Sequence, residues 1–199
     1  PPAGVRCDYG DDVPWDGCTD GKLSECVIGA CNKNNYLSLG NTAVVSLGSD
    51  RCAAAWLSEE FWEEGACPYS ILARPYDGLG DGVASAFAVN GYEDYGQDYP
   101  ALVSFEDGSF SVVWEGNFWC LGNPMKSIFA QRYDAEGGNM GEEIEVNLSA
   151  AYQERPDAAA LQNGRMVAVW EQQPDNSLGP GEVIGRVIDV DTPSESGEE

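Results

Sequence analysis

Five aspartates near the N-terminus form a dense group of potential metal ligands. Calcium takes about six to eight oxygen ligands, and short acidic loops rich in Gly can supply them. The stretch lacks the EF-hand pattern, whose last position is Glu. Calcium is therefore the one cofactor predicted here, with solvated surface charge as the alternative. The five residues are Asp8, Asp11, Asp12, Asp16 and Asp20.

The seven cysteines are the second set of reactive side chains. Four of them lie in an N-terminal stretch too poor in apolar residues to form a core, and their spacing is not that of a zinc site. Disulfides are therefore predicted, with the pairing left open. A Cys52–Cys67 bridge is expected across one hairpin, whereas Cys120 is a free thiol or an intermolecular bridge. The disulfide candidates are Cys7, Cys18, Cys26, Cys31, Cys52 and Cys67.

The absence of His removes the commonest general base near neutral pH. Ser-His-Asp and Cys-His catalysis and His-ligated zinc are excluded. Glycoside hydrolysis needs two carboxylates at a fixed separation, but the 34 acidic residues mark no particular pair. We therefore predict that the chain is not an enzyme. Asn147 begins the sequon Asn-Leu-Ser and is a candidate glycosylation site.

The net charge of −24 argues against a nucleic-acid partner and against an anionic membrane surface. No apolar run is long enough to span a bilayer, so membrane insertion is not expected. The chain starts with Pro-Pro-Ala-Gly rather than Met. Together with the cysteines, this predicts a processed protein that is secreted, extracellular or held at a cell surface.

A repeated phrase sets the architecture that must position these residues. It reads FEDGSFSVVW at 105–114, LQNGRMVAVW at 161–170 and LGSDRCAAAW at 47–56. Each copy ends in a Trp, and a second phrase follows, SILARPYD at 70–77 and SIFAQRYD at 127–134. Val-Asn and then Gln-x-x-Pro complete the unit. Trp56, Trp114 and Trp170 are therefore predicted to be equivalent core residues.

A complete unit contains four short extended runs. Apolar residues alternate with the period of a strand in FSVVW and IEVN of the middle unit. The third unit lacks an apolar fourth run. Four antiparallel strands repeated at this interval are typical of a propeller blade. The predicted fold is all-β, with three propeller-like blades at about 42–90, 100–147 and 156–189. A Cys- and Asp-rich irregular segment, 1–34, precedes a β-repeat domain, 35–191. An acidic tail, 192–199, follows it.

The repeat resembles tandem repeats of large secreted bacterial surface proteins. The resemblance lies in two successive motifs, Pro-x-(V/A)-x-x-(L/F)-x-(D/N)-G-x-(F/M)-x-V-x-W and then (F/L)-A-(Q/R)-x-Y-D. These repeats accompany adhesin-like and calcium-rich RTX-type chains. The resemblance covers roughly 42–191 and is strongest in the middle unit. It implies an extracellular, non-catalytic, propeller-like array and identifies no ligand.

Two functions follow from these observations. The first is a structural or assembly protein that self-associates into a homo-oligomer or filament, or adheres at a bacterial cell surface, with the strand NYLSL at 35–39 exchanged between chains. The alternative is a module that binds a cell-surface glycan or protein, or a fragment of a longer array. Unrepeated aromatic residues suit either a sugar site or a subunit interface. They are Trp15, Trp62, Trp119, Tyr92 and Tyr95.

Overall fold

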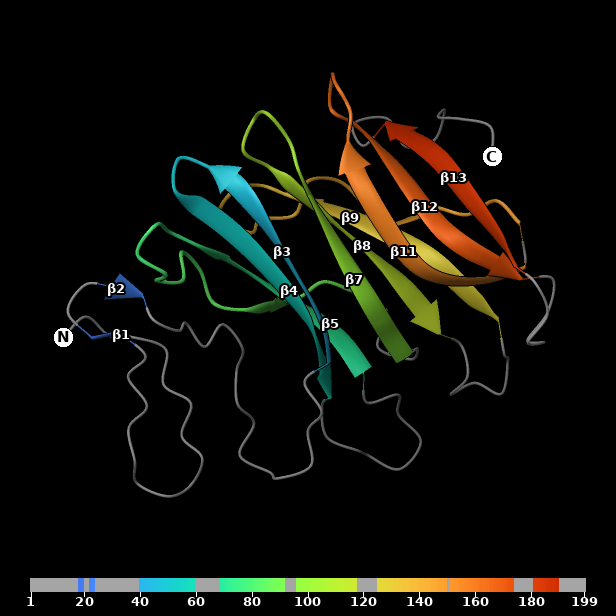
Figure 1. Ribbon diagram of the computed structural model, residues 1–199, viewed down its shortest axis with the longest axis horizontal. Helices are drawn as coiled ribbons and strands as arrows, with labels where there is room; N and C mark the ends of the chain where they lie inside the picture. The colour runs from blue at the N-terminus through green and yellow to red at the C-terminus, as the bar shows by residue number, and fades with distance from the viewer. Residues whose placement is uncertain are drawn as a thin grey trace.

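The structure is a computed structural model in which the described residues form β-strands joined by turns. The described residues are 18–19, 22–23, 40–59, 69–91, 96–117, 125–149, 151–173 and 181–189. Figure 1 shows three sheets that follow one another across the molecule, from the blue strands to the red ones. Among the described residues, no helix is long and apolar enough to cross a bilayer.

Every strand pairs only with strands that neighbour it along the chain. The sheet orders are β3-β4-β5-β6, β7-β8-β9-β10 and β11-β12-β13, and all pairs are antiparallel. A separate two-stranded pair, β1 (Cys18–Thr19) and β2 (Lys22–Leu23), lies near the N-terminus. The strands of the three sheets are β3 (Gly40–Gly48), β4 (Arg51–Glu59), β5 (Tyr69–Tyr76), β6 (Phe87–Ala88), β7 (Gly96–Ser104), β8 (Phe110–Asn117), β9 (Lys126–Tyr133), β10 (Ile144–Glu145), β11 (Tyr152–Ala160), β12 (Arg165–Gln173) and β13 (Glu182–Asp189).

The turns that join the first and second strands have the conformation that their sequences predict. Asn163 and Gly164, between β11 and β12, have φ of 62° and 70°. Gly108, between β7 and β8, has φ of 84°. Asn and Gly adopt this left-handed region at the least steric cost, so Asn-Gly and Asp-Gly favour tight hairpins here.

The core lies between the sheets, where the repeated Trp residues pack. Trp114 packs between the first and middle sheets, and Trp170 packs between the middle and third sheets. The side chain of Trp114 also donates a hydrogen bond from Nε1 to Oε1 of Gln97 at 2.8 Å. In the third sheet the equivalent bond is not formed, because Nε1 of Trp170 and Oε1 of Gln153 are both buried without a hydrogen-bond partner among the described residues.

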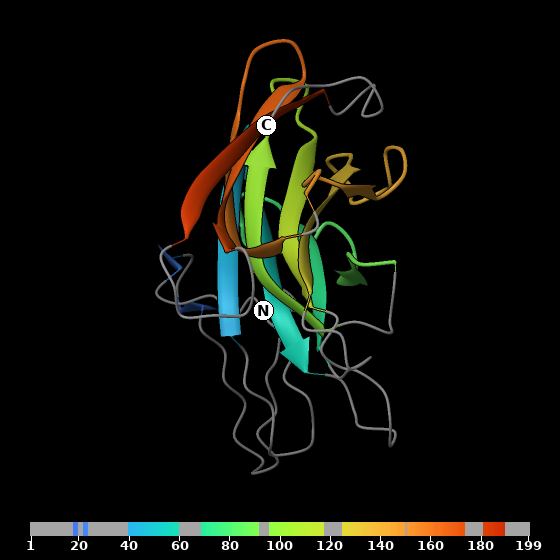
Figure 2. The ribbon, with the colours of Figure 1, turned by 90° about the vertical axis from the view of Figure 1, so that its right-hand side faces the viewer.

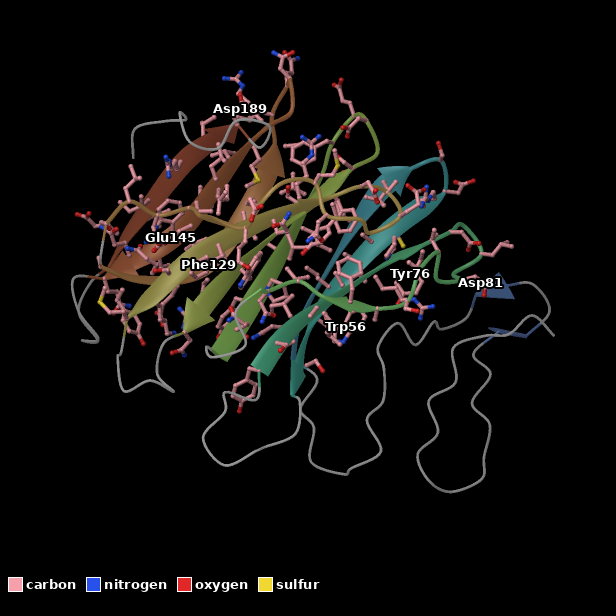
Figure 3. The ribbon with its side chains drawn as sticks, turned by 180° about the vertical axis from the view of Figure 1, so that it is seen from behind. Trp56, Tyr76, Asp81, Phe129, Glu145 and Asp189 are labelled. Atoms are coloured by element: carbon pink, nitrogen blue, oxygen red, sulfur yellow. The ribbon has the colours of Figure 1, made fainter. Side chains whose placement is uncertain are left out.

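Trp56 occupies the equivalent place in the first sheet, but it lies in a separate cluster with Tyr76 and Ala54. Figure 3 shows Trp56 and Tyr76 on this first sheet. All three Trp residues are buried, as predicted. The propeller-like repeat therefore places one Trp on the same side of each sheet.

Hydrogen bonds and aromatic contacts connect the sheets at the side of the short fourth strands. Figure 2 shows β6 and β10 on the same side of the molecule. The hydroxyl of Tyr133 donates to the carbonyl oxygen of Val89 at 3.0 Å, and its ring lies 4.9 Å from that of Phe87. A guanidinium N–H of Arg186 donates to the carbonyl oxygen of Val146 at 2.7 Å. The middle and third sheets thus each contact the segment around the fourth strand of the sheet before them.

The predicted all-β class and the three antiparallel sheets are confirmed. The third sheet has three described strands instead of the four that a complete blade requires. The strand predicted at 35–39, the acidic tail at 192–199 and most of the segment 1–34 lie outside the described residues.

Candidate functional site

A β-bulge interrupts the first strand of each sheet near its beginning. The bulges lie between Gly40 and Thr42, between Asp98 and Ala101, and between Glu154 and Asp157. An extra residue in one strand bends it and redirects the side chains beside it. Bulges of this kind are frequent next to functional sites. Each of these three contains a non-Gly residue with positive φ: Asn41 (42°), Tyr99 (48°) and Arg155 (51°).

Acidic residues gather at the bulges of the middle and third sheets. Asp98 and Glu154 immediately precede the left-handed residues of β7 and β11. Their partners on the second strands are Glu115 and Glu171, each of which follows a repeated Trp. In Figure 1, the lower ends of β7 and β8 mark this edge of the molecule.

Lys126, the first residue of β9, binds two of these carboxylates at once. Its Nζ lies 2.6 Å from Oε1 of Glu115 and 2.6 Å from Oε1 of Glu154. The side chains are only 11%, 1% and 16% exposed, respectively. Lys126 also lies 4.9 Å from the centre of the Tyr152 ring. This ammonium group therefore joins the middle sheet to the third through buried charge.

Burial and charge act against each other in this group. Burial is the largest influence on Glu115 and raises its pKa, although Lys126 acts in the opposite direction. Burial alone would lower the pKa of Lys126, but its hydrogen bonds to Glu115 and Glu154 outweigh this and raise it. Lys126 is therefore held as a cation, and the two carboxylates share it.

The remaining groups at this edge are more accessible. Arg155 lies 3.1 Å from Oε2 of Glu171, and both side chains are about half exposed, at 55% and 45%. The pKa of Arg155 is raised, first by its hydrogen bond with Tyr99 and then by the charge of Glu171. The side-chain amide of Asn41 donates to Oδ1 of Asp98 at 2.5 Å, which links the first sheet to the middle one.

We call this set the bulge cluster. It combines carboxylates, cations, an amide and a phenol at one edge of three adjacent sheets, so it offers many donors and acceptors to a polyhydroxylated ligand. It also places two carboxylates, Asp98 and Glu154, at equivalent bulges of neighbouring first strands. Most glycoside hydrolases use a pair of carboxyl groups. Its members are Asn41, Asp98, Tyr99, Glu115, Lys126, Glu154, Arg155 and Glu171.

Two sequence-predicted site residues have other roles. Cys52 is a free cysteine, and burial raises the pKa of its thiol. It pairs with Tyr76, at the opposite end of the β4–β5 hairpin from Tyr69. The predicted Cys52–Cys67 bridge is therefore corrected, because a hairpin brings together only the residues that its register places opposite each other.

Asn147 is buried, with 7% of its surface exposed. Its Oδ1 accepts from the backbone N–H of Ile128 at 2.7 Å, and its Nδ2 donates to the carbonyl oxygen of Ser149 at 3.1 Å. A glycan on Nδ2 would need open space beside an amide that is buried here. Burial argues against glycosylation of Asn147, which stays a prediction.

The other predicted site residues cannot be placed. The described part of the chain holds no group of three or more His, Cys, Asp or Glu that could bind a metal. The five N-terminal aspartates lie outside the described residues, so calcium stays a prediction without support. The following also lie outside, in whole or for their side chains: Cys7, Cys18, Cys26, Cys31, Cys67, Cys120, Trp15, Trp62, Trp119, Tyr92 and Tyr95.

Sequence reasoning did not single out any member of the bulge cluster. The signal was present in the repeat itself. The second residue of Gln-x-x-Pro is acidic in both copies, as Asp98 and Glu154, and Glu follows Trp in two of the three Trp phrases. These positions recur because they occupy the same edge of successive sheets.

Comparison with known proteins shows the fold. No protein-family model matches the chain, and no curated protein sequence does either. An N-acetylgalactosamine deacetylase from F. plautii, solved in complex with blood group B trisaccharide, superposes with a TM-score of 0.57. It is 10% identical, with 85% of this chain and 54% of that chain covered.

Two enzymes of arabinose-containing glycans are also similar. The GH93 α-L-arabinofuranosidase of Fusarium graminearum, solved with arabinobiose, has a TM-score of 0.52 and 13% identity, over 79% of this chain and 49% of that chain. The Penicillium chrysogenum α-L-arabinanase, also complexed with arabinobiose, has a TM-score of 0.50 and 12% identity, over 77% and 46%. This chain spans about half the length of these proteins.

These similarities correct the functional prediction. The three solved proteins named above share the fold and are carbohydrate-active enzymes. This contradicts the prediction of a non-catalytic, self-associating or adhesive protein. The same finding contradicts the prediction that the chain is no enzyme. Neither the filament nor the adhesion hypothesis has support, and the alternative of a glycan-binding module agrees better with the comparison.

Proposed function

We propose that the chain forms consecutive blades of a β-propeller that binds and hydrolyses a carbohydrate, with the bulge cluster as its site. The observation that carries this proposal is the pair Asp98 and Glu154, at equivalent bulges of adjacent first strands. A shared fold does not by itself establish an activity. The proposal therefore rests on the carboxylates, and the similar enzymes support it.

The pair has the chemistry that hydrolysis requires. One carboxyl group gives a proton to the leaving oxygen, while another carboxylate takes a proton from the attacking water. Asp98 and Glu154 are both partly exposed. Glu115 and Lys126 lie deeper, and Lys126 holds Glu154 by an ion pair. We therefore assign the catalytic pair to Asp98 and Glu154, and positioning to Lys126 and Glu115.

The charge of the site points to a neutral sugar. The bulge cluster contains four carboxylates, Asp98, Glu115, Glu154 and Glu171, and only two cations, Lys126 and Arg155. The whole chain carries a net charge of −24. Anionic sugars would be repelled by this field, whereas hydroxyl groups of a neutral oligosaccharide can bond to carboxylates and to the amide of Asn41. The predicted extracellular location, where such glycans occur, stays a prediction.

The test compares Asp98→Asn with Glu106→Gln. Asn keeps the shape of Asp98 and an oxygen that accepts from Asn41, but it removes the charge. Glu106 is an exposed carboxylate in the turn beyond the other end of β7, so it is a matched control. Binding and release of reducing sugar are measured with neutral arabino-oligosaccharides and oligosaccharides that contain N-acetylgalactosamine.

We expect the wild type and Glu106→Gln to bind and cleave the same substrate. Asp98→Asn should bind it but cleave it about a hundredfold more slowly, because a group that transfers a proton is lost. Equal cleavage by Asp98→Asn and the wild type would remove Asp98 from the mechanism. A wild type that neither binds nor cleaves any neutral oligosaccharide would overturn the proposed function.

A further inference from the structure

Trp114 and Trp170 occupy equivalent places in the middle and third sheets, but their indole N–H groups have different surroundings. In the middle sheet, Nε1 of Trp114 donates to Oε1 of Gln97 at 2.8 Å. Gln153 precedes Trp170 by the same number of residues as Gln97 precedes Trp114. The repeat alone would therefore place the same bond in the third sheet.

The third sheet instead leaves a buried donor and a buried acceptor unpaired. Nε1 of Trp170 and Oε1 of Gln153 have no hydrogen-bond partner among the described residues. Trp170 is 1% exposed and Gln153 is 0% exposed, so both atoms are shielded from bulk solvent. Unpaired polar groups inside a protein cost free energy, and internal water satisfies such groups where the protein itself does not.

The two sheets differ in the residue that lies opposite the Gln. Gln97 pairs with Gly116 of β8, whereas Gln153 pairs with Gln172 of β12. Gly116 is required in the middle sheet, because a Cβ at this position would lie 2.4 Å from the ring of Phe129. Gln153 thus has a polar side chain beside it where Gln97 has none.

This polar neighbour and Ser149 hold the amide of Gln153. Nε2 of Gln153 donates to Oε1 of Gln172 and to Oγ of Ser149, both at 3.1 Å. Oγ of Ser149 donates to the same Oε1 of Gln172 at 2.7 Å. Exchanging the amide oxygen and nitrogen of Gln153 would place two acceptors 3.1 Å apart, and Trp170 would still lack an acceptor. The network therefore keeps Gln153 from repeating the bond that Gln97 makes.

The side chain beside the indole is also smaller in the third sheet. Trp114 pairs with Phe129, whose ring centre lies 6.0 Å from that of the Trp. Trp170 pairs with Ile184, which has no ring. A buried water requires a polar site with two or more partners and space for one small molecule. The exchange of Phe for Ile favours that space, and the unpaired atoms of Trp170 and Gln153 are the partners.

We infer that one internal water molecule binds between Trp170 and Gln153. It accepts from the indole N–H and donates to Oε1 of Gln153. The water links β12 to β11, as the direct bond between Trp114 and Gln97 links β8 to β7. The water site is independent of the carbohydrate activity proposed for the bulge cluster.

Nuclear magnetic resonance of the full chain, with nitrogen-15 in its tryptophans, detects such a water directly. A water that stays bound while the protein tumbles gives a nuclear Overhauser cross-peak to the indole proton that it contacts. We expect this cross-peak at Trp170 and not at Trp114, whose N–H is bonded to Gln97. Each indole signal is assigned through the contacts of its ring with neighbouring side chains.

The matched variants are Gln153→Met and Ser149→Ala. Gln153→Met removes the acceptor that holds the water and should abolish the cross-peak at Trp170. Ser149→Ala removes a nearby hydroxyl whose proton also exchanges with water, and the cross-peak should remain. Loss of the cross-peak in Ser149→Ala would trace it to this hydroxyl and overturn the inference.

The wild type alone also decides the matter, whether or not the variants fold. No water cross-peak at Trp170, or equal cross-peaks at Trp170 and Trp114, would overturn the inference. A high-resolution crystal structure is the second measurement. It should show a water within hydrogen-bond distance of Nε1 of Trp170 and Oε1 of Gln153, and a direct bond between these two atoms would exclude it.

Discussion

Within the bulge cluster, Lys126 forms ion pairs with two carboxylates at once. Two carboxylates lie 2.6 Å from its ammonium group, and one of them, Glu115, is almost completely buried. Buried carboxylates without a counter-ion are costly, because their charge is removed from water. Lys126 therefore links the middle and third sheets at this edge, next to the hydrogen bond from the backbone N–H of Arg155 to Oε2 of Glu115.

Replacement of Lys126 by Met should lower the free energy of unfolding by about 3 kcal/mol or more at neutral pH, because Glu115 and Glu154 lose their counter-ion. The raised pKa of Lys126 sets the pH range of this effect. The stabilisation is complete below the ordinary value of 10.5 and is lost as the pH rises through the higher folded-state pKa. Urea unfolding of both proteins at pH 7 and pH 9 measures the difference, which should be the same at both because both lie below 10.5.

The double variant Lys126→Met with Glu115→Gln is the control for this prediction. It removes the charge that Met leaves unpaired, so it should be more stable than Lys126→Met alone. Equal stabilities of the single and double variants would show that Glu115 does not depend on Lys126.

At the scale of elements, the repeated Val-Asn pair closes the outer edge of a sheet. The N–H groups of Val89 and Val146 donate to the carbonyl oxygens of Ile71 and Ile128, respectively. The N–H groups of Ile71 and Ile128 donate in turn to Oδ1 of the Asn in each pair. Asn90 and Asn147 close the edges of the first and middle sheets through side-chain oxygens. A strand of two residues has few ladder bonds, so β6 and β10 depend on this side-chain contact.

Asn147→Ala should lower the free energy of unfolding by about 1 to 3 kcal/mol, because the buried N–H of Ile128 loses its acceptor. Asn139→Ala, at an exposed position between β9 and β10, should change stability by less than about 0.5 kcal/mol. Thermal and urea unfolding measure both. If the two variants are equally stable, Asn147 does not close the edge of the middle sheet.

The strands and turns were predictable because they depend on local signals. Alternating apolar residues, Asn163-Gly164 and the repeated Trp phrase each specify a hairpin within a few residues. The bulge cluster was not predictable, because its members are brought together by the stacking of separate sheets. Glu115 and Glu154 are 39 positions apart in the sequence, yet they bind the same Lys126. The strand partner of Cys52 was not predictable either. The register of the β4–β5 hairpin, not proximity in sequence, places Cys52 opposite Tyr76.

For the whole molecule, the dominant property is the excess of negative charge. The chain has 34 acidic and 10 basic residues, and folding brings these charges closer together. Repulsion between them opposes the compact state, and salt screens it. The ion pair of Lys126 is buried and is screened less than exposed charges are.

The melting temperature should therefore rise by several degrees between about 0.01 M and 0.3 M NaCl, because the screened repulsion exceeds the screened attraction. Differential scanning fluorimetry measures it, and KCl in place of NaCl controls for a specific effect of sodium. A melting temperature that falls with salt would mean that surface ion pairs outweigh the net charge.

The pairing of each strand with its neighbours along the chain also affects how the protein folds. Hairpins within one sheet close short loops, which costs little chain entropy. Docking of the sheets through Trp114 and Trp170 joins more distant segments and comes at a greater entropic cost. We expect hairpins to form early and independently in each sheet, as in repeat proteins whose units contact only their neighbours. Assembly of the bulge cluster would then be a late event on the folding pathway, completed only when the middle and third sheets have docked.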